Sequence, residues 1–285
     1  MDMSRWNRNE IRKILLECAG KGIGYFGKTQ WQLKSDRSLV TEADMEIEGA
    51  LAGYFDRPDD GIYMIGEETV AAKNEKYIRS AFANTAFIVD PIDGTAPFAH
   101  GIPTWGIMIG YMSKGRLEEG GIVLPSTGQL VISDNGVNYI SYLGNGGEYS
   151  PLKRYSAPKS PPVEGGLISV SQNIVREWNV ASTNPLHAVC CSAFSSIYLL
   201  MGRYLAFVGC PKLWDVAAVL PILWNAGFQG RLLSGETLDP DVNEKCYHLR
   251  RDDKRRWYLR DQMILAANSA NADYVESILR KPGKP

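Results

Sequence analysis

The stretch Phe87-Ile88-Val89-Asp90-Pro91-Ile92-Asp93-Gly94-Thr95 organises the rest of the chain. Three apolar residues typical of a buried strand lead directly into two acids, so the carboxylates stand where the strand gives way to a turn. Pro91 fixes the backbone between Asp90 and Asp93, which lets both side chains and the Ile92 carbonyl face one point. Converging oxygen ligands favour a hard divalent cation, Mg²⁺ before any softer metal.

The two residues that follow the acids add an anion-binding property. Gly94 allows close approach of the main chain, and the amides of Gly94 and Thr95 can receive an anionic oxygen if a helix begins there. The stretch from Asp90 to Gly94 is also typical of an ordinary surface turn, because Asp, Pro and Gly dominate turns for reasons unrelated to catalysis. The other acids of the chain therefore decide between a metal site and an ordinary turn.

Length and charge limit the classes of protein. A chain of 285 residues forms one large domain or two of ordinary size. Its formal net charge of -1, with both signs scattered, argues against a nucleic-acid or membrane-surface partner. No apolar run reaches the ~18 residues needed to span a bilayer, and residues 1–8 lack a signal pattern, so we expect a cytoplasmic protein. The five cysteines include no C-x-x-C pair, which predicts reduced, mostly buried thiols.

The first half of the chain predicts helices and then an antiparallel sheet. Apolar residues at helical spacing predict helices near 4–26 and 41–55, with a helix-prone connector over 71–81. A short strand over 61–65 precedes the central one. Glycine- and serine-rich turns then separate four further predicted strands, which form an antiparallel meander over 104–111, 121–124, 129–133 and 137–142.

The second half alternates strands and helices. The proline-rich segment 149–166 is the best linker, so we predict an N-terminal α+β domain over 1–150 and a C-terminal α/β domain over 151–285. Predicted strands lie at 167–170, 187–189, 204–208 and 264–267, and predicted helices at 174–180, at 192–202, from 215 onward and at the C-terminus. The charged stretch 241–261 carries both signs and is expected to form a solvated hairpin.

Three more acids stand at the ends of predicted elements, and each also has a structural explanation. Asp44 follows Thr41 by three residues, the pattern of a capping box, although a carboxylate in a first helical turn is also rigidly aimed. Glu67 ends an apolar run as Asp90 does, while Glu68 beside it is expected to be solvated. Asp215 stands at a helix N-terminus, where N-capping alone accounts for it.

Acids at element ends repel one another unless cations hold them together. Two or more Mg²⁺ ions solve this, with Asp90 as the natural bridging ligand. Such a site suits attack of water on phosphorus, because one ion lowers the pKa of a bound water and another stabilises the leaving oxygen. The sequence shows no Walker loop and no nucleophilic serine or cysteine dyad.

These motifs, in order and spacing over nearly the whole chain, resemble the inositol monophosphatase family of Mg²⁺-dependent, Li⁺-sensitive phosphatases. The matching stretches are Gly66-Glu67-Glu68, the central motif from Asp90 to Thr95, Trp214-Asp215-Val216-Ala217-Ala218, and the segment with Lys34, Asp36, Ser38, Val40, Thr41, Ala43 and Asp44. The resemblance implies a layered α/β/α/β/α sandwich and a homodimer. It also implies a small phosphate ester as substrate.

The resemblance assigns roles residue by residue. It implies two or three Mg²⁺ ions bound by Glu67, Asp90, the Ile92 carbonyl, Asp93 and Asp215. It implies activation of the attacking water by Asp44, Glu67 and Thr95. It implies substrate contacts from Asp93, Gly94, Thr95 and Ala193.

Departures from the family pattern bear on the substrate. Cys191 stands where inositol phosphatases usually carry glycine, Val208 where an acid often recognises a substrate hydroxyl, and Ala96-Pro97 where a polar pair is common. Losing a buried polar partner weakens discrimination between hydroxylated substrates. Inositol phosphate, sugar phosphate, 3'(2')-phosphoadenosine nucleotide, fructose bisphosphate and histidinol phosphate therefore all remain candidate substrates.

Two rival interpretations remain. Aspartyl-phosphate phosphatases use a D-x-D-G-T motif after a strand, but here Pro91 and Ile92 separate the acids, and Glu67 and Asp215 would be unexplained. The other rival is a regulatory or binding protein that keeps the fold without turnover.

Overall fold

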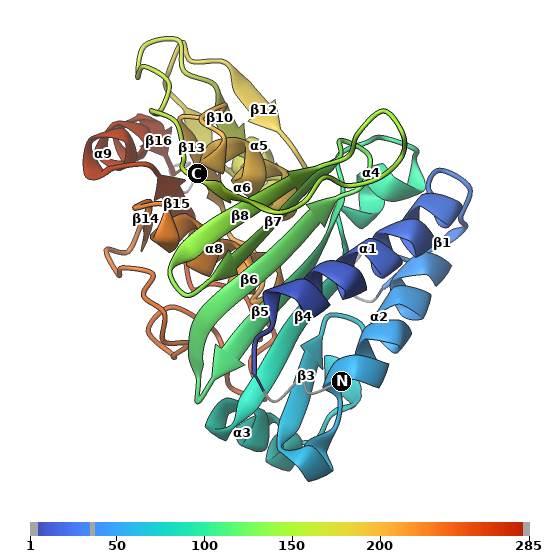
Figure 1. The fold of residues 1–285 in the computed structure, drawn as a ribbon. Helices are drawn as coiled ribbons and strands as arrows, with labels where there is room; N and C mark the ends of the chain where they lie inside the picture. Colours follow the sequence, from blue (N-terminus) through green and yellow to red (C-terminus); the bar gives the residue numbers. More distant parts are fainter. Residues whose placement is uncertain (1–4, 35–37, 282–285) are drawn as a thin grey trace.

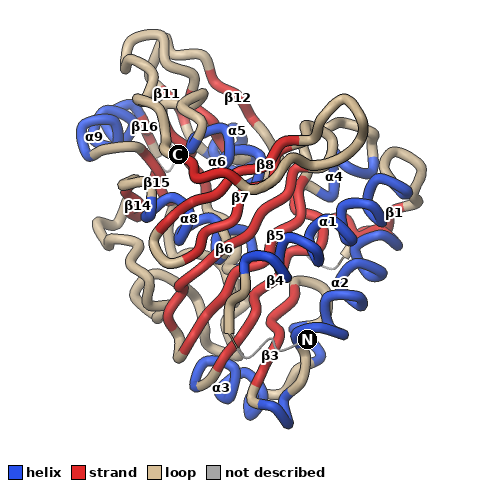
Figure 2. The backbone as a smooth tube through the Cα atoms, in the orientation of Figure 1, coloured by secondary structure: helices blue, strands red, loops and turns tan. Residues whose placement is uncertain are grey.

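A computed structural model describes residues 5–34 and 38–281. Figure 1 and Figure 2 show a mixed α/β molecule in which helices and two sheets alternate in the order α/β/α/β/α. The predicted fold class is thus confirmed. Of the residues used for the family resemblance, Asp36 lies outside the described residues. The division into domains at residue 150 stays a prediction.

The larger sheet has seven strands in the spatial order β3-β4-β5-β6-β7-β8-β9. β3 and β4 are parallel, and each later neighbour pairs antiparallel, which is the predicted meander. The last strand, β9, falls inside the segment interpreted as a linker. The strands are β3 (Ile62–Gly66), β4 (Thr85–Asp93), β5 (Gly106–Ser113), β6 (Arg116–Leu124), β7 (Gln129–Asp134), β8 (Val137–Tyr142) and β9 (Lys153–Tyr155).

Two long helices cover the outer face of this sheet (Figure 1). α1 (Arg8–Tyr25) begins at Asn7, whose side chain accepts from two amides of the first turn, and packs on β5 and β6. α2 (Glu42–Phe55) packs on β4 and follows a small hairpin of β1 (Trp31–Leu33) and β2 (Leu39–Thr41). Short elements at the ends of the first strands are η1 (Pro58–Asp60), η2 (Val70–Ala72), α3 (Glu75–Ala83) and α4 (Thr95–Ala99).

The smaller sheet has the order β12-β10-β13-β15-β14. β10 pairs parallel with both neighbours, whereas β15 is antiparallel to β13 and β14. The strands are β10 (Ile168–Val170), β12 (Leu186–Ala188), β13 (Ala206–Gly209), β14 (Gln229–Leu232) and β15 (Met263–Ala266); the sequence did not predict β14. Its outer face carries α5 (Gln172–Glu177) and α9 (Ser269–Ile278), beside a ribbon of β11 (Asn179–Val180) and β16 (Leu279–Arg280).

Three helices form the layer between the sheets: α6 (Ser192–Leu200), α7 (Trp214–Ala217) and α8 (Val219–Asn225). Ala217 and Ala218 lie directly on two sheet glycines, because a Cβ on Gly110 would stand 2.7 Å from the Ala217 carbonyl carbon and one on Gly120 would meet the Ala218 carbonyl. The small Ala217 and Ala218 therefore let this helix pack closely on the sheet. The helix breaks at Ala218, because Pro221 has no N–H to donate to the Ala217 carbonyl.

The charged stretch 241–261 differs from its prediction. Its two ends do pair antiparallel, through a bridge between Tyr247 and Leu259, but Tyr247, Trp257 and Leu259 are buried in the core between the sheets. Arg256 forms an ion pair with Glu75 at 2.7 Å. The alternating charges masked these buried apolar residues, so the prediction that the stretch is solvated was wrong.

Within residues 5–34 and 38–281, every helix is too short or too polar to span a lipid bilayer.

Candidate active site

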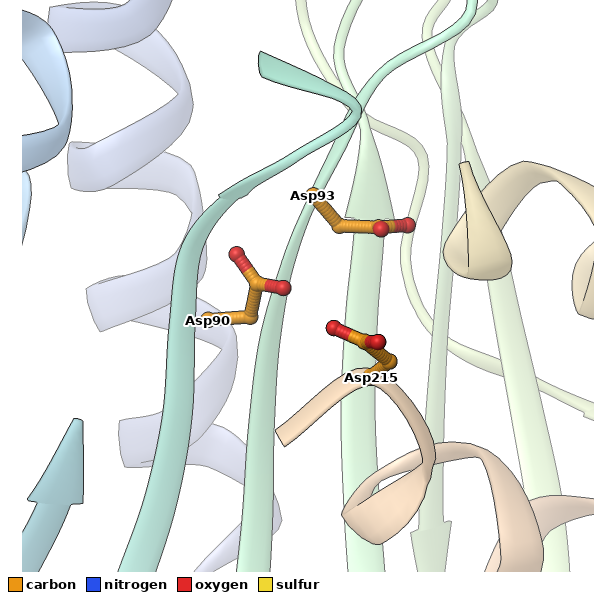
Figure 3. Close-up of side chains that lie close together, drawn as sticks. All are labelled: Asp90, Asp93 and Asp215. Carbon is orange, nitrogen blue, oxygen red and sulfur yellow. The ribbon is translucent and has the colours of Figure 1, made fainter. Parts of the chain in front are cut away.

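Asp90 and Asp93 stand at the end of β4, where the pairing with β5 shifts register between them. The irregularity lies at Pro91, which cannot donate a ladder hydrogen bond. Asp215 approaches from the first turn of α7, and all three carboxyl groups point toward one another (Figure 3). One oxygen of each lies within 4.8 Å of the others. The acids predicted at two distant positions therefore meet at one point.

The three carboxyl groups are held in a setting that disfavours their charge. Burial, followed by the charges of Glu67, Asp93 and Asp215, raises the pKa of Asp90 well above its ordinary value. Burial is also the main cause that raises the pKa of Asp93 to about 6 and that of Asp215 to about 7. Repulsion from neighbouring carboxylates, Glu67 in all three cases, adds to each shift. A bound cation would relieve both burdens.

Asp90 Oδ1 supplies the most specific observation of the site. It is a buried carboxylate oxygen that has no hydrogen-bond partner among residues 5–34 and 38–281. Folded proteins rarely leave such an atom unsatisfied unless a ligand or ion completes it. Because this carboxyl group converges with those of Asp93 and Asp215, the oxygen-rich donor set fits a hard divalent cation such as Mg²⁺.

Glu67 reaches the same place from the neighbouring strand. β3 is parallel to β4, so the carboxyl ends of the two strands share one edge of the sheet, as the sequence predicted. Glu67 lines one pocket together with Asp90 and Asp215. Its carboxylate, however, pairs with two ammonium groups, Lys34 Nζ at 3.2 Å and Lys212 Nζ at 3.6 Å. It is not part of the group of three acids whose oxygens converge within 4.8 Å.

The turn that carries Glu67 is held by a residue that sequence reasoning missed. Glu48, fully buried on α2, accepts from the backbone amides of Glu68 at 2.9 Å and Thr69 at 2.8 Å. A Cβ on Gly66 would clash with the Glu48 carboxylate, so only glycine fits there. Glu68 was expected to be solvated, but its side chain is 6% exposed and pairs with Lys34 at 2.6 Å, because the turn faces α2 and the hairpin rather than water.

Asp44 performs the capping role that the sequence predicted and also reaches the site. Its Oδ2 accepts from the Thr41 amide at 2.8 Å and from the Thr41 hydroxyl, and Thr41 Oγ1 accepts from the Asp44 amide at 3.4 Å, which completes the capping box of α2. Its Oδ1 lies 3.3 Å from Thr95 Oγ1, whose hydroxyl also lies 3.0 Å from the Ile92 carbonyl. Burial raises the pKa of Asp44 to about 6. The two interpretations of Asp44 are thus compatible.

Asp93 is oriented by the start of α6. Its Oδ2 accepts from the Cys191 thiol at 2.9 Å and from the Ala193 amide at 2.5 Å. Cys191 is also the N-cap of α6, since its sulfur accepts from the Phe194 amide at 3.2 Å. Gly94 has φ 85°, and a Cβ there would lie 2.7 Å from a backbone oxygen. The Ala193 N–H donates to Asp93 rather than facing the pocket unpaired. The substrate contact proposed for Ala193 stays a prediction.

Two adjoining pockets form the site. The acidic pocket, about 250 Å³, is lined by Ser38, Leu39, Glu67, Asp90, Ile92, Asp93, Gly94, Thr95, Ala96, Gln172, Cys190 and Asp215. The side pocket, about 220 Å³, shares four of these residues and extends toward β13 and α5. The sequence comparison singled out Val208 as the position where relatives often carry a substrate-binding acid. In the structure Phe207 lines the side pocket, whereas Val208 belongs to the core on the opposite face of β13. Strand alternation explains the difference of one residue.

Comparison with known proteins places the chain in a family. A model of the inositol monophosphatase family matches residues 7–281. The chain belongs to this family. A histidinol-phosphatase of Chlorobaculum parvum is 30% identical over 256 residues, which cover 79% of this chain and 88% of the relative. Membership of the inositol monophosphatase family and this likeness indicate a phosphoric monoester hydrolase.

Solved structures agree in fold. An IMPase of Thermotoga maritima aligns with a TM-score of 0.71 at 19% identity and covers 96% of this chain and 97% of its own. An IMPase/NADP phosphatase solved with Mg²⁺ and phosphate gives 0.68 at 20% identity, with coverage of 96% and 97%. At these identities the likeness concerns the fold. Dependence on a divalent metal is supported by the family together with the acidic cluster.

Proposed function

We propose that this protein is a Mg²⁺-dependent phosphomonoesterase that hydrolyses a small phosphorylated metabolite. The observation that carries the proposal is Asp90 Oδ1, a buried oxygen that finds no hydrogen-bond partner in the described part of the chain and belongs to a carboxyl group that converges with those of Asp93 and Asp215. Uncompensated, three such carboxylates destabilise the fold. Proteins retain such clusters of carboxylates at sites where the negative charge binds a ligand.

Asp90, Asp93, Asp215, Glu67 and the Ile92 carbonyl are the proposed ligands of two or three Mg²⁺ ions. When bound, the metal supplies charge neutralisation and lowers the pKa of water beside it. Glu67 reaches such an ion only by exchanging contact with Lys34 and Lys212. The ammonium groups released in this exchange remain beside the pocket and add positive charge that suits a phosphate.

Thr95 and Asp44 are proposed to move the proton of the attacking water. Thr95 Oγ1 accepts that proton and passes its own to Asp44 Oδ1, 3.3 Å away. The pKa of about 6 makes Asp44 a stronger base than an ordinary aspartate. Gly94, whose conformation brings the main chain close to the acids, and the Thr95 amide are the proposed contacts of the phosphate oxygens.

The test is a panel of phosphate esters assayed with Mg²⁺, with EDTA, and after Mg²⁺ is restored. Turnover of at least one sugar, inositol, nucleotide or amino-alcohol phosphate that EDTA abolishes and Mg²⁺ restores is expected. Turnover that persists in EDTA, or phosphate trapped covalently on Asp90, would favour the aspartyl-phosphate mechanism instead. No turnover of any ester would support the silent regulatory protein.

Three further properties remain predictions from the family resemblance and the sequence: inhibition by millimolar Li⁺, a homodimer, and a cytoplasmic location. The Li⁺ response is measured in the same assay. Size-exclusion chromatography with light scattering measures the oligomeric state.

A further inference from the structure

Lys212 stands three residues before Asp215 and contacts two of the proposed metal ligands. Its backbone N–H donates to Asp215 Oδ2 at 2.8 Å, and its ammonium nitrogen lies 3.6 Å from Glu67 Oε1. Both of these acids line the acidic pocket, and the Lys212 side chain is only 16% exposed. The inference that follows rests on the proposed function, because it assumes that Mg²⁺ and phosphate bind at the acids.

The main chain around Lys212 is held by the end of the charged stretch 241–261. The Leu213 amide donates to the Trp257 carbonyl at 2.8 Å, and an antiparallel bridge pairs Lys212 with Tyr258. These contacts are made by the backbone. A change of the Lys212 side chain therefore leaves the loop before α7 in place.

Two aromatic rings lie beside the ammonium group itself. The Lys212 nitrogen is 5.4 Å from the centre of the Trp214 ring and 5.4 Å from the centre of the Tyr258 ring. Both distances are within the range of a cation–π interaction, in which the face of the ring attracts the positive charge. The rings thus keep the ammonium group beside the pocket even when Glu67 turns to another cation.

Lys34, the other lysine on Glu67, has a different arrangement. Its ammonium nitrogen lies 3.2 Å from Glu67 Oε1 and 2.6 Å from Glu68 Oε1. Both of its carboxylate partners therefore belong to the turn after β3. Lys212 instead connects that turn with α7, because it contacts Glu67 through its side chain and Asp215 through its backbone.

We propose that Lys212 is a fixed cation of the site, which competes with Mg²⁺ for Glu67 and attracts the phosphate. In the metal-free protein its ammonium group offsets part of the negative charge of the acids. Glu67 has to leave this ammonium group to bind Mg²⁺, and the two cations repel each other, so Lys212 lowers the affinity for the metal. The same positive charge raises the affinity for phosphate, which is an anion. The two effects have opposite signs.

The experiment removes the charge in Lys212→Met, which retains a long, unbranched side chain. Isothermal titration of the metal-free variant should show Mg²⁺ binding about tenfold tighter than in the unmodified protein. Titration with inorganic phosphate at saturating Mg²⁺ should show binding about tenfold weaker. Lys212→Arg keeps the charge and should bring both affinities back toward those of the unmodified protein.

The matched control is Lys73→Met, because the setting of Lys73 resembles that of Lys212. Lys73 forms an ion pair with Asp56 at 2.5 Å, lies 4.5 Å from the centre of the Tyr77 ring, and has a side chain that is 22% exposed. It lines neither pocket of the site. Both affinities should be unchanged in this variant.

The outcomes separate this inference from the function beneath it. Weaker Mg²⁺ binding in Lys212→Met would assign Lys212 a purely structural role, and equal binding would show that its charge does not reach the metal; either result overturns the competition. Unchanged phosphate binding in the same variant overturns the attraction of the phosphate. Absence of Mg²⁺ binding by the unmodified protein overturns both the proposed function and the inference that rests on it.

Discussion

Two buried carboxylates in this molecule, Glu48 and Asp90, have opposite surroundings. Glu48 on α2 accepts two backbone amides from the turn after β3. Asp90 at the end of β4 leaves Oδ1 without any partner in the described chain and faces two more acids. Burial raises the pKa of both. A buried carboxylate whose oxygens accept hydrogen bonds stabilises the fold. A buried carboxylate with an oxygen that lacks a hydrogen-bond partner indicates where a ligand binds.

The contrast has a thermodynamic consequence. Removing charge from Glu48 leaves two amides with a poorer acceptor and should cost stability. Removing charge from the group of Asp90, Asp93 and Asp215 relieves repulsion and should cost function only. Stability and activity therefore separate at these two sites.

The largest expected effect is loss of turnover in Asp93→Asn. The variant keeps its shape and its contact with the Ala193 amide but loses the negative charge aimed at the metal, so kcat should fall by roughly a thousandfold or more. Phosphatase assays measure the loss, and circular dichroism should show an unchanged fold. Asp252→Asn is the control, since Asp252 has a side chain that is 76% exposed. Normal turnover in Asp93→Asn would remove Asp93 from the site.

The metal-free protein should lose stability as pH rises. Burial and repulsion raise the pKa of Asp93 to about 6 and of Asp215 to about 7 from the ordinary 3.8. The folded state thus keeps protons that the unfolded state releases, so their contribution to stability is full below pH 4 and falls until about pH 7. In EDTA, Tm should drop by roughly 5 °C or more between pH 5 and pH 8.

Mg²⁺ should reverse that drop, and its stabilisation should grow with pH because deprotonated carboxylates bind it. Asp215→Asn serves as the comparison, since it should flatten the pH dependence in EDTA. Equal pH profiles for the variant and the unmodified protein would show that Asp215 does not carry the effect.

Glu48→Gln should mainly lower stability, whereas substitutions in the acidic cluster should mainly lower activity. The amides of Glu68 and Thr69 lose a charged acceptor, which should lower the free energy of unfolding by about 1–3 kcal/mol. Denaturant titration in EDTA measures this. Activity should fall less than in Asp93→Asn, because Glu67 is displaced rather than neutralised. A variant as stable as the unmodified protein would break the distinction between the two kinds of carboxylate.

The smallest expected effect belongs to Cys191, which orients Asp93 without contacting the other acids. Cys191→Ser keeps a donor of similar size and should preserve Mg²⁺ affinity. Cys191→Ala removes the thiol hydrogen bond and should weaken Mg²⁺ binding by about tenfold, the lower range for residues that position a ligand. Isothermal titration measures both affinities. Equal affinities in the two variants would leave Cys191 as a helix cap only.

Local sequence patterns predicted the acids of the site better than the residues that hold those acids in place. Asp90, Asp93 and Asp215 stood out because acids followed an apolar strand or began a helix, and the structure brings these three together. The Thr41 capping box was equally local and is present. Such features depend on neighbours within a few residues, which the sequence displays directly.

Features that depend on tertiary contacts were not visible. Glu48 lies inside a helical pattern, and its partners are backbone amides twenty residues away, which no side-chain motif records. Phe207 rather than Val208 faces the pocket, because the face that a strand residue presents depends on sheet pairing. The stretch 241–261 looked solvated since its charges outnumber the two buried aromatic residues, Tyr247 and Trp257.

The central claim is that the converging acids bind Mg²⁺, and isothermal titration of the metal-free protein and of Asp90→Asn measures it most directly. The unmodified protein should bind Mg²⁺ with release of protons at pH 6.5, and binding should be lost in the variant. The metal-free variant should also melt at a higher temperature, because a repelling charge is gone. Equal Mg²⁺ binding by the two proteins, or none by the unmodified protein, would contradict the account.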